Sequence, residues 1–225
     1  MELIPRNLVV AVFMAPASAA PTSSLSSDQL GRIWLEVAKD YGFTQLAMAG
    51  DGSSGNLLGP AAEDGVTIQP PLLQIRDSIR TTTEQSADKA QVISQVVARH
   101  LGVSQFFNLG VRLIYHAAVP GNDGSSFVLG RVLSKGEEDL AQLRAGGQLW
   151  GGVKYVITNP GVMYTLLIEP LIADPKYLYL DLDAQLPGVV DATAIVPKAR
   201  ECERFITGPV SEYLDSLVVG RGRLQ

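Results

Sequence analysis

The sequence holds a single cysteine, Cys202, in 225 residues, so an intrachain disulfide is excluded. A chain of this length buries roughly 70% of the surface that its unfolded state exposes, so it needs no covalent cross-link or structural metal to fold. The charges beside Cys202, Arg200 and Arg204 against Glu201 and Glu203, offset each other, and no electropositive setting activates the thiol. We therefore expect Cys202 to be a small apolar side chain packed in a core.

Charged residues are also scarce, and the net charge of the chain is small. Charged residues make up 18% of the chain and the net charge is −5, whereas soluble domains average roughly 25% charged residues. No run of Lys and Arg could neutralise a phosphate backbone, which excludes nucleic acid as a partner. No segment approaches the roughly 20 apolar residues that cross a bilayer, which excludes a membrane helix. So few charges suggest a surface partly covered by copies of the chain or by another protein.

The N-terminal region has two readings. Residues 8–15 are apolar, and Ala17, Ser18 and Ala19 follow like the small residues of a signal-peptide cleavage site. The segment before this run contains Glu2 as well as Arg6, so it is a poor match to the basic region of a signal peptide. We therefore interpret residues 7–14 as a buried first strand of a bacterial cytoplasmic protein. The alternative is an exported protein whose signal segment runs from Leu8 to Ala19.

Hydrophobic periodicity predicts more strands than helices. A helix is expected from a cap at Ser26 or Ser27 to Gly42, a second from Thr83 to Gly102, a short one over 137–144, and a last one opening near Pro197. Strands are expected over 8–13, 44–48, 72–79, 109–119, 127–133, 152–158, 162–168 and 177–185, with 127–133 as a hairpin partner of 109–119. Because there is no regular alternation of strand and helix, we predict an α+β fold, a mainly antiparallel sheet with helices packed on one face. The domain organisation expected is a single domain over 1–225, or two subdomains over about 1–105 and 106–225.

The stretch from Gly50 to Gly55 has the spacing of a dinucleotide-binding fingerprint. That fingerprint works only when its glycines open a helix whose N-terminus faces a pyrophosphate. The residues that follow, including Gly59 and Pro60, cannot start such a helix, and no acidic residue lies at the required distance. A surface loop is the better interpretation.

Asp181 and Asp183 are the strongest candidates for chemistry. On a strand they lie on one face, with Leu180 and Leu182 on the other. Two such carboxylates can hold Mg²⁺ for phosphoryl transfer, but the upstream Gly-Ser turn with which nucleotidyltransferases hold phosphates is missing. The competing interpretation is a strand with one polar face whose carboxylates pair with Arg112 or Arg76, since a guanidinium on a sheet needs a carboxylate.

The two histidines do not suggest a metal centre. His116 shares a strand face with Arg112, since their spacing is even, and His100 lies near a helix C-terminus. Neither has the cysteine or HExxH context of a zinc site. No G-x-S-x-G nucleophile elbow occurs either. We expect no cofactor and no metal.

Several segments together resemble a sporadically distributed family of bacterial proteins to which no activity is assigned. They are an N-terminal strand like residues 8–14, the Gly110-Val111-Arg112 strand, the Leu180-Asp181-Leu182-Asp183 strand and the closing Phe205-Ile206-Thr207 element. The chain departs from that pattern in the Gly-Pro after Thr207 and in Leu113, where an aromatic residue is usual. The resemblance implies a shared fold and supplies no mechanism.

The sequence therefore favours a non-enzymatic binding or assembly protein, a subunit that self-associates or forms a complex. The alternative is a metal-dependent phosphoryl-transfer or nuclease-like enzyme that uses Asp181 and Asp183.

Overall fold

The computed structural model describes residues 1–16, 24–61, 63–135, 139–140 and 149–219. The first half of the chain contains β1 (Leu3–Pro16), α1 (Ser27–Tyr41), β2 (Gln45–Met48), β3 (Gly55–Leu58), β4 (Gly65–Gln69), β5 (Leu72–Ser78) and α2 (Thr83–Leu101). The second half begins with β6 (Val103–Ala118), the 3-10 turn η1 (Pro120–Asn122), α3 (Gly124–Phe127) and the π-helix η2 (Val128–Val132). It continues with β7 (Val153–Asn159), β8 (Val162–Pro170), β9 (Tyr177–Val190), the 3-10 turn η3 (Ala192–Ala194), α5 (Ile195–Phe205), the π-helix η4 (Ile206–Val210) and α6 (Ser211–Val219).

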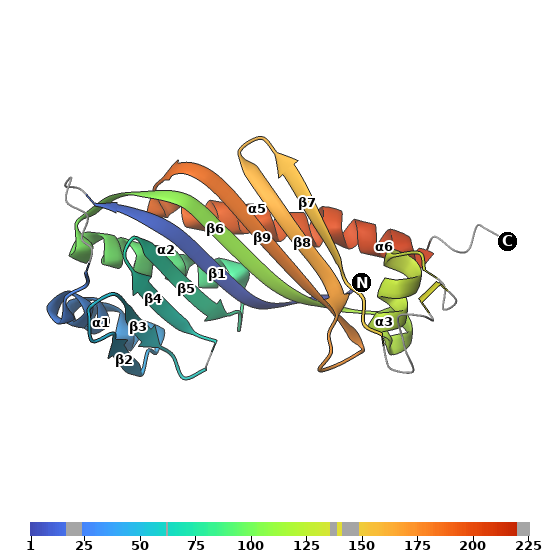
Figure 1. Cartoon of the computed structure of the whole chain (residues 1–225), viewed down its shortest axis with the longest axis horizontal. Helices are drawn as coiled ribbons and strands as arrows, with labels where there is room; N and C mark the ends of the chain where they lie inside the picture. The colour runs from blue at the N-terminus through green and yellow to red at the C-terminus, as the bar shows by residue number, and fades with distance from the viewer. Residues whose placement is uncertain (17–23, 62, 136–138, 141–148, 220–225) are drawn as a thin grey trace.

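The strands form one nine-stranded sheet in the order β2-β3-β4-β5-β1-β6-β9-β8-β7, and each neighbouring pair is antiparallel. Helices α2, α5 and α6 run across one face of this sheet, and α1 lies beside the small strands at one end (Figure 1). The predicted α+β fold with a mainly antiparallel sheet and helices on one face is confirmed.

The sheet has one covered face because its longest strands alternate apolar and polar side chains. In β9, every second residue from Leu178 to Leu186 is buried, while the residues between them are partly exposed. The apolar faces of β1, β6 and β8 continue the same layer, and the helices bury it into one continuous core. At roughly 25 cal/mol per Å² of apolar surface removed from water, this layer is the main stabilising term.

The caps of the two long helices follow from the sequence. The Ser26 side chain accepts a hydrogen bond from the Gln29 amide, and Gly42 ends α1 with a φ of 69°. Thr82, one residue before the predicted cap, is the N-cap of α2, and Gly102 ends the helix with a φ of 64°. Glycine is suited to both ends because L side chains rarely adopt positive φ.

One expectation was wrong, and another lies outside the described residues. Residues 127–133 do not form a hairpin partner of β6, because Asp123 caps a helix there by accepting a hydrogen bond from the Ser126 amide. The loop predicted for Gly50 to Gly55 is confirmed, since residues 50–54 form a turn and Gly55 is the first residue of strand β3. The short helix predicted over 137–144 falls mostly on residues outside the described part of the chain.

The two halves of the chain repeat one order of elements. Each begins with a long strand, continues with a helix and a run of antiparallel strands, and closes with a helix on the covered face. The two opening strands, β1 and β6, pair with each other at the middle of the sheet, and the closing helices α2 and α5 are in contact. The sheet is therefore built from two similar units joined through their first strands.

Candidate functional site

The face of the sheet that the helices leave uncovered, here called the open face, carries the residues singled out in the sequence. Strand pairing places Arg112 opposite Asp183, Ile114 opposite Asp181 and His116 opposite Tyr179. Because paired residues point to the same side of a sheet, Arg112, His116, Asp181 and Asp183 all face away from the helices.

Asp181 is held by a bidentate ion pair. The Arg112 Nε donates to Asp181 Oδ1 at 2.8 Å and Nη2 donates to Oδ2 at 2.5 Å. The Asp181 side chain is only 12% exposed, and Arg112 is 47% exposed. The bond to Asp181 raises the pKa of Arg112 further above its ordinary value. Asp181 therefore stays paired with a permanent cation, as the structural interpretation of Arg112 required.

Asp183 has a different partner. Its Oδ1 accepts a hydrogen bond of 2.7 Å from Gln185 Nε2 on the same strand. Within the described ranges, no group of three His, Cys, Asp or Glu side chains is arranged to hold a metal ion. A metal bound between the two aspartates would compete with the Arg112 guanidinium for the Asp181 carboxylate.

A hollow of about 420 Å³ lies at the middle of the open face. Its floor is low because β1 and β6 carry the small residues Ala11 and Gly110 side by side. A Cβ atom on Gly110 would lie 3.4 Å from Gln185 Nε2 and 3.6 Å from the Ala11 carbonyl oxygen, in ordinary contact. The longer side chains that line the hollow are Gln74, Arg76, Arg112, Asp183 and Gln185.

Arg76, which lines this hollow, has an unsatisfied donor. Its Nε atom is buried, and it has no hydrogen-bond partner among the described residues. A buried donor without an acceptor costs about 1–3 kcal/mol, more when it is charged. Because this atom is buried, a group seated in the hollow does not reach it, and Arg76 lines the hollow with other atoms of its side chain.

Apolar side chains lie on the open face beside the hollow, towards the end of the sheet where β7 and β8 turn. Phe13 is 45% exposed, Met163 41% and Val189 61%. Phe13 pairs with Phe107, which in turn pairs with Val189, so these side chains lie in one row across β1, β6 and β9. A second hollow of about 440 Å³ separates Phe13 from Met163 and shares Gln185 with the first. The polar hollow and the apolar row therefore form one continuous surface.

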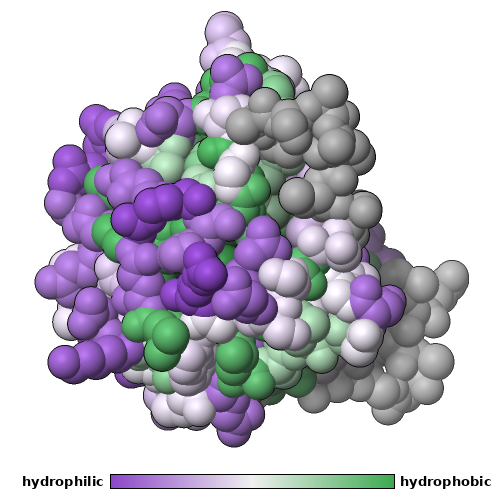
Figure 2. Space-filling view, turned by 90° about the vertical axis from the view of Figure 1, so that its left-hand side faces the viewer, coloured by the Kyte–Doolittle hydropathy of each residue, from purple (hydrophilic) through white to green (hydrophobic). Residues whose placement is uncertain are grey.

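The end of the molecule at which α1 and β2 lie has a different surface. Hydrophilic residues predominate there, and hydrophobic ones form small separate groups (Figure 2). Leu35 on α1 is 79% exposed in this region. Single exposed apolar residues of this kind are normal on a protein surface and mark no site.

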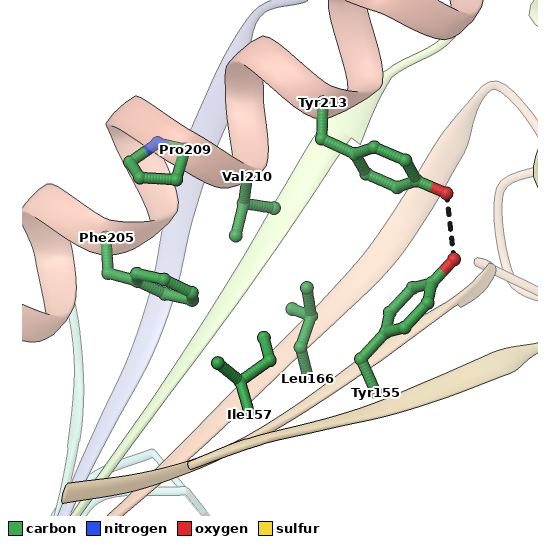
Figure 3. Close-up of a pocket in the computed structure, with 7 residues that line it drawn as sticks. All are labelled: Tyr155, Ile157, Leu166, Phe205, Pro209, Val210 and Tyr213. Carbon is green, nitrogen blue, oxygen red and sulfur yellow. Dashed lines mark hydrogen bonds between the residues drawn. The ribbon is translucent and has the colours of Figure 1, made fainter. Parts of the chain in front are cut away.

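A third hollow lies on the covered face, between β7 and β8 of the sheet and the segment from α5 to α6. Its volume is about 240 Å³, and its lining is almost wholly apolar: Tyr155, Ile157, Leu166, Phe205, Pro209, Val210 and Tyr213. Figure 3 shows the rings of Tyr155 and Tyr213 converging from opposite walls, with their hydroxyl groups at one end of this pocket. The two hydroxyl oxygens are 2.8 Å apart and the rings meet edge to face, with centroids 5.9 Å apart.

The helix above this pocket departs from α geometry. Residues Ile206–Val210 form the π-helix η4, with Pro209 inside it. Proline has no amide hydrogen and its ring clashes with the preceding turn, so it interrupts the hydrogen bonds of an α-helix. Pro209 and Val210 of this turn line the pocket opposite Ile157 and Leu166 (Figure 3).

The remaining candidates serve the structure. Cys202 is buried, and burial raises the pKa of its thiol to about 12. The His116 ring accepts a hydrogen bond of 3.1 Å from Arg6 Nε, and burial with the nearby Arg6 charge lowers its pKa. His100 is hydrogen-bonded to Glu36 at 2.8 Å. The glycines at 50–55 form the turn between β2 and β3, where Met48 pairs with Gly55, so they open no helix.

Sequence reasoning missed the pocket. The tyrosines Tyr155 and Tyr213 are 58 positions apart in the chain, and no local pattern links them. Gly110 and Ala11 gave a signal that could have been used, because small residues in the middle of long strands mark places where another group approaches closely.

No protein-family model matches the chain, and no curated protein matches it either. The family resemblance described above therefore stays a prediction. In the described part of the chain, no helix is both long enough and apolar enough to cross a membrane.

Proposed function

We propose that the protein is a non-enzymatic binding protein that self-associates through the open face of its sheet. One observation carries this proposal: the open face joins a polar hollow to a row of exposed apolar side chains, Phe13, Met163 and Val189. Exposed apolar side chains gathered in one place are costly in a surface that meets only water, and a partner seated on this face would cover them.

A second copy of the chain is the partner that the charges of this face fit best. The pairing register and the hydrogen bonds of Arg6 with His116 and of Glu63 with Asn7 give the open face four cations and four anions: Arg6, Arg76, Arg112 and Lys154, and Glu63, Glu169, Asp181 and Asp183. A two-fold interface brings a surface against itself and must be self-complementary. A face of balanced charge meets that requirement, whereas a face of one sign would repel its own copy. The low content of charged residues, 18%, supports the same proposal.

Sedimentation of three proteins tests this proposal: the wild type, Met163→Lys on the open face, and Leu35→Lys on α1 as the control. We expect a dimer for the wild type and for Leu35→Lys, and a monomer for Met163→Lys, because a lysine at a buried interface position loses its hydration without gaining a partner. A wild type that stays monomeric at all concentrations, or two variants with the same assembly state, would refute self-association through this face.

The alternative proposal, a metal-dependent phosphoryl-transfer or nuclease-like enzyme, rests on the placement of Asp181 and Asp183 on one strand face. The bidentate bond from Arg112 weighs against it, since both Asp181 oxygens are occupied. Calorimetric titration with Mn²⁺ distinguishes the two functions. Saturable binding by the wild type that is lost in Asp181→Asn would favour the enzyme.

We also propose that residues 8–19 are retained, as in a cytoplasmic protein, and are not removed as a signal segment. Strand β1 pairs with β5 on one side and β6 on the other, and Leu8, Val10 and Val12 are each 1% exposed. Cleavage after Ala19 would remove the strand that joins the two halves of the sheet. N-terminal sequencing of the native protein tests this directly.

A further inference from the structure

We propose that the pocket between β7, β8 and the α5–α6 segment binds a small, mainly apolar molecule that carries one hydrogen-bond acceptor, such as an aryl ketone. This site lies on the covered face, away from the open face, so it does not depend on self-association.

The size and lining of the pocket set the bulk of the ligand. A dry apolar cavity of about 150 Å³ holds a benzene molecule. The pocket here has a volume of about 240 Å³, which leaves room for a benzene ring with a short substituent. Phe205, Tyr155 and Tyr213 offer ring faces and edges, and aromatic pairs favour offset or edge-to-face contact with an aromatic guest.

The tyrosine pair sets the polar feature of the ligand. Each hydroxyl group has one hydrogen to donate, and the contact between Tyr155 and Tyr213 uses only one of them. A tyrosine hydroxyl group is neutral at physiological pH, and burial raises the pKa of Tyr213 still further, to about 12. The second hydrogen remains for an acceptor at the end of the pocket where Figure 3 shows the hydroxyl groups. A neutral carbonyl oxygen suits this place, because the rest of the lining offers a charged group no partner.

The geometry also explains why the site has a single polar end. Ile157 and Leu166 line the pocket from the sheet, and Val210 lines it from the helix. A ligand with polar groups at both ends would bury one of them against these side chains without a partner. The pocket therefore selects a molecule that is apolar over most of its length.

Two probes of nearly the same shape test the proposal: acetophenone, which has one carbonyl acceptor, and ethylbenzene, which has none. Binding is followed by calorimetry and by the NMR shifts of the tyrosine ring protons. In the wild type we expect acetophenone to bind about fivefold more tightly than ethylbenzene, the difference that one net hydrogen bond makes.

The variant Tyr155→Phe/Tyr213→Phe removes both donors and keeps the apolar lining. We expect it to bind the two probes equally, at the affinity of ethylbenzene for the wild type. Ile157→Trp, on the edge strand β7, fills the pocket and should abolish binding of both probes. Circular dichroism melting checks that each variant is folded.

Three results would overturn the proposal. Absence of binding by both probes in the wild type would mean that the pocket takes no such ligand. Equal binding of the two probes by the wild type would refute the role of the tyrosine pair. Unchanged binding in a folded Ile157→Trp would place the probes elsewhere. None of these outcomes affects the assembly state, so this proposal and self-association can fail separately.

Discussion

Replacing Arg112 by methionine removes the guanidinium group from Asp181 while keeping a long unbranched side chain on β6. The size of the effect follows from the two exposures, 12% for the carboxylate and 47% for the guanidinium. Fully exposed ion pairs contribute about 0–1 kcal/mol, and leaving a buried polar group unpaired costs about 1–3 kcal/mol. Because Asp181 is nearly buried and Arg112 is half in water, we expect Arg112→Met to lower the free energy of unfolding by about 2 kcal/mol.

Urea unfolding measures this loss. For a chain of this size the denaturant slope is roughly 3 kcal/mol per molar urea, so the unfolding midpoint should fall by about 0.7 M. Arg32→Met is the matched control, since Arg32 pairs with Asp28 on α1 and both side chains are largely exposed, 64% and 72%. We expect this variant to lose less than about 0.5 kcal/mol.

The comparison between the two arginine variants decides the outcome. Equal midpoints for Arg112→Met and Arg32→Met would show that the bidentate pair adds no more than a surface pair, and the structural role of Asp181 would then be wrong. A double variant, Arg112→Met with Asp181→Leu, should recover part of the loss, because it removes the unpaired carboxylate together with its partner.

Two other predictions concern titratable groups. Burial raises the pKa of Cys202 to about 12, so the native thiol should react with a disulfide reagent only after denaturant is added; rapid reaction of the folded protein would place it at the surface. The folded-state pKa of His116 lies below its ordinary value of 6.5. The contribution of His116 to the free energy of unfolding should therefore be fully present above pH 6.5 and be lost as the pH falls through the folded-state pKa, because the unfolded state binds the proton more readily. His116→Gln should flatten that part of the stability profile measured by urea unfolding, and an unchanged profile would contradict the assignment.

The strands and helices with strong local signals could be predicted from the sequence. The alternation of leucines with polar residues over 177–185 identified β9, and Ser26, Gly42 and Gly102 marked helix ends within a residue. The helix at Gly124–Phe127 was missed, although Asp123 gave a capping signal, because the aromatic and β-branched residues after it suggested a strand. Strand β3 was missed because glycine and polar residues hide a pattern of only four positions.

The candidate sites were predictable to different degrees. Arg112 and Asp181 carry opposite charges on two strands of clear alternation, so their pairing could be anticipated before the strands were known to be neighbours. The pocket at Tyr155 and Tyr213 could not, because it depends on how far the π-helix holds the chain from the sheet. Such a distance is a property of tertiary packing and leaves no periodic trace in the sequence.

The pairing of β1 with β6 has a consequence for any fragment of this chain. A polypeptide that ends after α2 would keep the complete first unit but would lack β6. The edge of β1 that pairs with β6 would then have backbone amides and carbonyls without hydrogen-bond partners. In the absence of β6, this edge of β1 can pair with the same edge of β1 in a second, identical fragment. Truncation near Gly102 should therefore yield either a dimer of two fragments paired through β1 or an insoluble polymer. Co-expression of the two fragments should restore solubility, because β1 can then pair with β6 again.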